Sequence, residues 1–155
     1  MEKAKIKLVT IGHLPLHLDF SRVSTWKSDV FELTGEIENF ALRCDSDSDG
    51  WVFSDALLKA QLPAHTGAEF LIAIVNVPIE DNWYSRRLGD NQIVFTFSQI
   101  KDFLAWDNIP LENAILRVIY AYTLLYRRSG NRIPSLGQAP SFTHDETRGC
   151  LFDMN

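Results

Sequence analysis

The sequence predicts one α/β (α+β) domain over residues 1–155, with a mixed sheet of about four strands packed against two or three helices. Three observations lead to this fold class. Residues 68–79, AEFLIAIVNVPI, are almost continuously apolar, which is typical of a strand buried on both faces. Residues 110–130 carry apolar side chains at helical spacing. A chain of 155 residues that is 46% hydrophobic and 23% charged has the size and composition of one globular domain.

The N-terminal third is expected to supply strands. Residues 5–11, KIKLVTI, alternate in polarity and are rich in β-branched side chains, so they predict a first strand. Residues 24–42 are interpreted as strand, turn and strand, although the spacing of Ile37, Phe40 and Ala41 also suits a helix. His13 and His17 have the four-residue spacing of zinc ligands on a helix, but Pro15 between them argues against a helix. We therefore expect two surface histidines in a loop.

Residues 45–52, DSDSDGWV, match the first half of a calcium-binding EF-hand loop. Oxygen ligands stand at the first, third and fifth positions, and a glycine stands at the sixth. The twelfth position, which should supply a bidentate carboxylate, is Ala56. This missing ligand argues against calcium and favours an acidic surface turn. Ser54 then suits the N-cap of a short helix that begins at Asp55.

The middle of the chain is expected to complete the sheet. Residues 68–79 should form its central strand, and residues 80–92, EDNWYSRRLGDNQ, a long polar loop. Residues 91–97, NQIVFTF, alternate cleanly and predict a second core strand, antiparallel to the first through that loop. Ser98 should cap a short helix over residues 99–106. The apolar face of that helix is expected to contain Ile100, Phe103 and Leu104.

The polar loop carries the first candidate site. Trp83, Tyr84, Arg86 and Arg87 combine aromatic and arginine side chains, the composition of a protein-binding surface. The same composition suits a loop whose aromatic side chains pack back on the domain. In the binding interpretation these four residues, together with Arg148 of the C-terminal segment, would contact a protein or peptide partner whose identity the sequence does not reveal.

Residues 110–130 predict a central buried helix. Pro110 suits the first helical position, and Glu112 places a negative charge in the first turn, where the helix dipole favours it. Gly130 is expected to end the helix in a left-handed conformation. Apolar residues cover most of the circumference, so we expect the helix to be buried between layers, with the sheet on one side and the polar C-terminal segment nearby.

The C-terminal segment contains the second candidate site. Thiolate and imidazole ligands suit zinc, so His144, Cys150 and Asp153 are the predicted metal ligands. His144, Asp145, Glu146 and Cys150 are the candidate catalytic residues, either of a zinc-dependent hydrolase or of a Cys–His nucleophile pair. The alternative is a docked tail in which Cys150 is buried as a small apolar residue. The six-residue separation of His144 and Cys150 is not that of a known zinc motif.

The order of the segments AIVNVPI, NQIVFTF, ENAILRVIYAYTLLY and CLFDM resembles that of the archaemetzincin-like, zincin-type metallopeptidases. In that family the helix corresponding to residues 111–126 carries the pattern H-E-x-x-H, whose histidines hold zinc and whose glutamate activates water. Here this helix contains no histidine, and its only carboxylate is Glu112. The resemblance therefore implies a catalytically degenerate relative that acts as a binding or regulatory module, or one whose site is rebuilt in the C-terminal segment.

The composition of the chain argues against two classes of protein, nucleic-acid-binding proteins and membrane-spanning proteins. The net charge of −5 and the lack of clustered basic residues beyond two Arg-Arg pairs argue against nucleic-acid binding. No apolar segment approaches the ~20 residues needed to cross a bilayer. With no secretory signal pattern and no cysteine framework, we expect a reduced, cytoplasmic protein. Two classes remain: a protein-interaction or regulatory module, and a zinc-dependent hydrolase.

Overall fold

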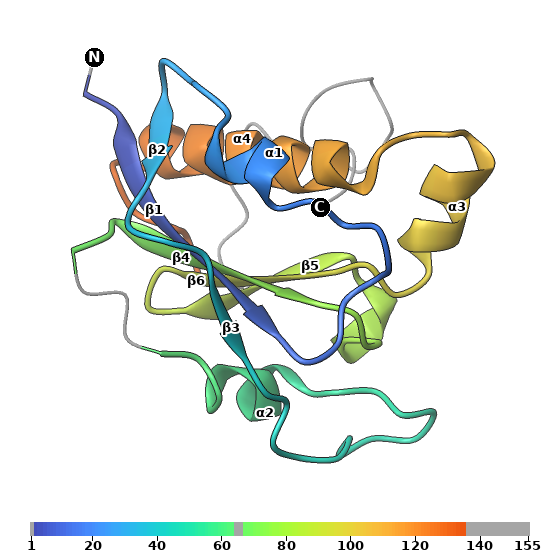
Figure 1. Cartoon of the computed structure of the whole chain (residues 1–155). Coiled ribbons are helices and arrows are strands. Elements are labelled where there is room, and N and C mark those ends of the chain that lie inside the picture. The colour runs from blue at the N-terminus through green and yellow to red at the C-terminus, as the bar shows by residue number, and fades with distance from the viewer. Residues whose placement is uncertain (1, 64–66, 136–155) are drawn as a thin grey trace.

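The computed structural model describes residues 2–63 and 67–135 and is built around a six-stranded, mostly parallel sheet (Figure 1). The strand order is β2-β1-β4-β6-β5, and β3 also pairs with β1. The strands are β1 (Ala4–Ile11), β2 (Phe31–Leu33), β3 (Glu38–Phe40), β4 (Phe70–Val75), β5 (Ser85–Gly89) and β6 (Gln92–Thr96). The helices are α1 (Ser21–Ser24), α2 (Asp55–Lys59), α3 (Ile100–Trp106) and α4 (Leu111–Arg128), with a 3-10 turn η1 (Glu80–Asn82). The α/β class is confirmed, with more strands and helices than the sequence predicted.

Strand β4 lies at the centre of the sheet, as its apolar sequence predicted. All six of its residues are buried. Alternate residues face opposite sides: Phe70, Ile72 and Ile74 join the core under α4, whereas Leu71 and Ala73 join the core on the α2 side. Because both faces are covered, the strand needs no polar face, and its sequence shows none.

The predicted antiparallel pairing of residues 68–79 with residues 91–97 is wrong. Strand β6 runs parallel to β4, and the segment between them, expected to be a loop, contains strand β5. Strand β5 pairs antiparallel with β6 at the edge of the described sheet. Asp90 and Asn91 connect these two strands with φ values of 53° and 56°, the left-handed pair required by a tight two-residue hairpin. The hairpin therefore joins β5 to β6, one strand later than predicted.

The two strands predicted within residues 24–42 exist, but they do not pair with each other. Both run parallel to β1: β2 pairs with its first half through Ala4↔Phe31, and β3 pairs with its second half through Val9↔Glu38. They therefore follow one another along the same edge of β1 (Figure 1). The short helix α1, which precedes β2, was not predicted.

Helix α4 covers one face of the sheet and confirms the predicted central helix. Ile115, Val118 and Ile119 are at most 4% exposed and pack against β4 and β6 side chains in one core cluster. Gly130 follows the helix with φ +76°, the predicted left-handed stop. Helix α2 and Phe53 cover the opposite face of the sheet. In the described part of the chain, no helix is long and apolar enough to cross a membrane.

Helix α3 departs from the prediction at its start and on its surface. Gln99, not Ser98, occupies the N-cap position, and no side chain caps the helix. Ile100 is buried and Leu104 is partly buried, as predicted, but Phe103 is 68% exposed. Helix α3 lies beyond the end of the sheet (Figure 1), and within residues 2–63 and 67–135 Phe103 belongs to neither core cluster.

Candidate functional site

Two segments that are distant in the sequence meet beside the end of the sheet. Phe53, which is fully buried, donates its backbone N–H to the carbonyl of Pro78 at 2.9 Å and forms a parallel bridge with Ile79. This contact places the acidic turn of residues 45–52 and the start of α2 next to residues 78–86. An apolar anchor therefore joins two polar surface segments.

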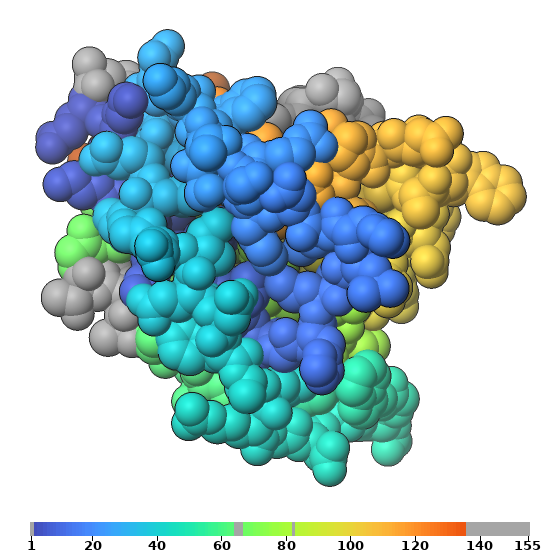
Figure 2. All heavy atoms as spheres, viewed as in Figure 1, coloured from blue at the N-terminus to red at the C-terminus, as the bar shows by residue number. Residues whose placement is uncertain are grey.

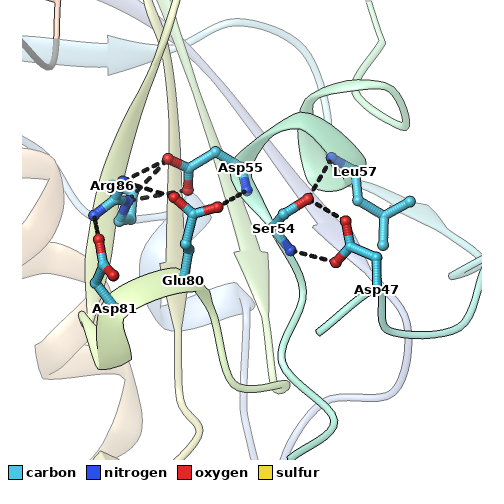
Figure 3. A network of polar contacts seen from close by, with 7 residues as sticks. All are labelled: Asp47, Ser54, Asp55, Leu57, Glu80, Asp81 and Arg86. Carbon is cyan, nitrogen blue, oxygen red and sulfur yellow. Dashed lines mark hydrogen bonds and ion pairs between the residues drawn. The ribbon is translucent and has the colours of Figure 1, made fainter. Parts of the chain in front are cut away.

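Arg86 of β5 connects these segments through a network of ion pairs (Figure 3). Its guanidinium, only 8% exposed, donates from Nε to both oxygens of Asp55 at 3.0 Å and from Nη2 to Asp55 Oδ2 at 2.7 Å. It also reaches Asp81 Oδ2 at 3.1 Å and Glu80 Oε2 at 3.3 Å. The hydrogen bonds to Asp55 raise the pKa of Arg86 above its usual value, because they stabilise the charged guanidinium. Arg86 therefore fixes the positions of α2, η1 and β5 relative to one another.

Asp47 ties the acidic turn to the same structure. Its carboxylate accepts hydrogen bonds from the backbone N–H of Ser54 at 2.9 Å and from the Ser54 hydroxyl. The Ser54 oxygen in turn accepts from the Leu57 N–H at 3.2 Å, which confirms Ser54 as the N-cap of α2. The hydrogen bond from the Ser54 hydroxyl lowers the pKa of Asp47 below its usual 3.8, and the hydrogen bond from the Ser54 N–H lowers it further. Asp47 therefore supports the helix cap, a local role that needs no metal.

Two exposed tryptophans lie in the same two segments of the chain as these carboxylates. Trp51 is 54% exposed and Trp83 is 46% exposed. Trp51 lies edge-on to Phe53, with ring centroids 5.6 Å apart, and has a φ of 61°. Asp81 also has a positive φ, 59°. Left-handed backbone is costly for residues other than glycine, especially bulky ones, and such strain is concentrated at functional sites.

We call this surface the acidic tryptophan face and define it by Asp45, Asp47, Asp49, Trp51, Glu80, Asp81 and Trp83. Residues 44–56 and 78–86 together contain six carboxylates and one guanidinium, that of Arg86. Six negative charges and one positive charge give these two segments a net charge of −5. The teal segment that contains residues 45–55 projects at the bottom of the molecule in Figure 2.

The predicted interaction residues are distributed unevenly around this face. Trp83 is exposed, Tyr84 packs partly against the α4 core, and Arg87 donates to the carbonyl of Pro134 at 3.3 Å. Arg86 points into the chain toward its carboxylates, so its guanidinium organises the site from within. Sequence reasoning did not associate Trp51 with these residues, because the two segments lie some thirty positions apart in the chain. The contacts that join them, among them the Phe53–Pro78 hydrogen bond and the Arg86–Asp55 ion pair, exist only in the folded structure.

The second predicted site lies outside the described residues. It comprises His144, Asp145, Glu146, Arg148, Cys150 and Asp153. Within residues 2–63 and 67–135, no group of three or more histidine, cysteine, aspartate or glutamate side chains is placed to hold a metal ion. His13 and His17 are exposed, as predicted. The zinc-site hypothesis therefore stays a prediction about the C-terminal segment.

No protein-family model, curated protein or solved structure matches this chain. The resemblance to the archaemetzincin-like metallopeptidases therefore stays a prediction as well. The helix on which it depends, α4, buries Ile115, Val118, Ile119 and Tyr122 in the core. Tyr122 shares a buried 2.8 Å hydrogen bond with Ser85 of β5, and burial raises the pKa of its phenol.

The Asp47–Ser54 pair gives a direct test of the local geometry. Replacing Ser54 by alanine removes the hydroxyl donor, so the pKa of Asp47 should rise back toward 3.8. The same change should cost about 1 kcal/mol of stability through the lost N-cap. A carboxyl-carbon NMR titration measures the first effect and urea denaturation the second. An Asp47 pKa that is unchanged in Ser54→Ala would show that the hydroxyl does not contact it in solution.

Proposed function

We propose that this chain is a protein-interaction module that binds a Lys/Arg-rich segment of a partner protein on the acidic tryptophan face. The observation that supports this proposal is the display of two half-exposed tryptophans among carboxylates. Exposed indole rings attract Lys and Arg cations through their π faces, and neighbouring carboxylates pair with the same cations. A cationic segment satisfies both kinds of group at once.

The Arg86 network supplies the rigidity that such a face requires. It holds Asp55, Glu80 and Asp81 by ion pairs between 2.7 and 3.3 Å, so both tryptophan-bearing segments are anchored before any ligand arrives. A preorganised surface loses less conformational entropy on binding. Arg86 neutralises only part of the local charge, which leaves the more exposed Glu80 and Asp81 able to contact a second cation.

Titration with a synthetic nonapeptide of alternating Lys and Arg, followed by tryptophan fluorescence and calorimetry, tests the proposal. Each exposed cation–π contact contributes ~0.5–1 kcal/mol, so Trp51→Ala or Trp83→Ala should weaken binding about two- to fivefold. The double variant should weaken it by about tenfold or more. Raising the salt concentration should also weaken binding, because long-range attraction between charges is screened.

Two controls test whether the cationic peptide binds specifically at the acidic tryptophan face. A Glu nonapeptide of the same length should not bind, and Trp26→Ala should leave the affinity unchanged, because Trp26 is 50% exposed but belongs to a different part of the fold. The proposal is wrong if the cationic peptide does not bind at low salt. It is also wrong if Trp51→Ala and Trp83→Ala bind the peptide as well as Trp26→Ala does.

A further inference from the structure

We draw no further inference here: the strongest candidate, the apolar surface of helix α3 and the residues after it, where Phe103, Trp106 and Ile109 are exposed, carries no proposal because nothing in the part of the chain that the structure describes shows what covers it.

Discussion

Replacing Arg86 by methionine should lower the free energy of unfolding by about 3–5 kcal/mol. Methionine keeps much of the side-chain volume, so the main change is the loss of a cation that is only 8% exposed. Its removal leaves the carboxylates of Asp55, Glu80 and Asp81 close together without a counter-charge. Urea denaturation followed by circular dichroism measures the effect.

A second substitution separates this electrostatic cause from lost packing. Asp55→Asn should destabilise the wild-type chain, because it breaks the shortest ion pair of the network, 2.7 Å. In the Arg86→Met background the same change should restore stability, because it removes one of the uncompensated charges. If Asp55→Asn is equally harmful in both backgrounds, the ion pair does not account for the loss.

Lys59→Met is the matched control for Arg86→Met, because it also replaces the cation of an ion pair by methionine, but at an exposed position. Lys59 pairs with Asp90 at 2.8 Å, but the two side chains are 37% and 79% exposed. Exposed ion pairs contribute about 0–1 kcal/mol. A loss in Lys59→Met as large as that in Arg86→Met would show that burial of the guanidinium is not what makes the Arg86 network important.

Leu125→Ala in α4 should cost about 2–5 kcal/mol. Leu125 is 4% exposed and belongs to the core cluster between α4 and the sheet. Its truncation removes apolar contacts and leaves a cavity that the packed strands beneath can fill only partly. Thermal or urea unfolding checks the value.

Leu116→Ala is the comparison on the same helix. Leu116 is only partly buried, at the border of the core cluster, so the same truncation should cost less there than at Leu125. The helical pattern of residues 110–130 does not distinguish these two leucines, because both belong to its wide apolar surface. If Leu125→Ala cost less than ~1 kcal/mol, α4 would be peripheral to the stability of the fold.

Segments with one dominant local signal were predictable from the sequence. Strand β4 is apolar throughout, β1 alternates, and α2 has Ser54 at its N-cap. Helix α4 has a long apolar pattern that ends before a left-handed glycine. In each case the local pattern and the tertiary environment favour the same structure, so the sequence is sufficient.

Strand β5 shows where such reasoning fails. Its sequence, SRRLG, was expected in a loop because strands are usually recognised by apolar alternation. Here Arg86 is accommodated by carboxylates from two other segments, and Ser85 by the hydroxyl of Tyr122 at 2.8 Å. Two of these partners, Asp55 and Tyr122, lie 31 and 37 positions away from the residues that they contact, so the local sequence contains no trace of them.

The sequence by itself determined the α/β class, the central strand, the long helix and the presence of aromatic and arginine side chains near residue 83. Only the tertiary structure decided that β6 is parallel to β4, that Arg86 faces inward, and that an Arg86–Asp55 ion pair joins the segments that contain Trp51 and Trp83. The physical reason is that the periodicity of apolar residues along a segment indicates only which side chains of that segment are buried. Strand direction and ion-pair partners depend instead on which distant segments pack together.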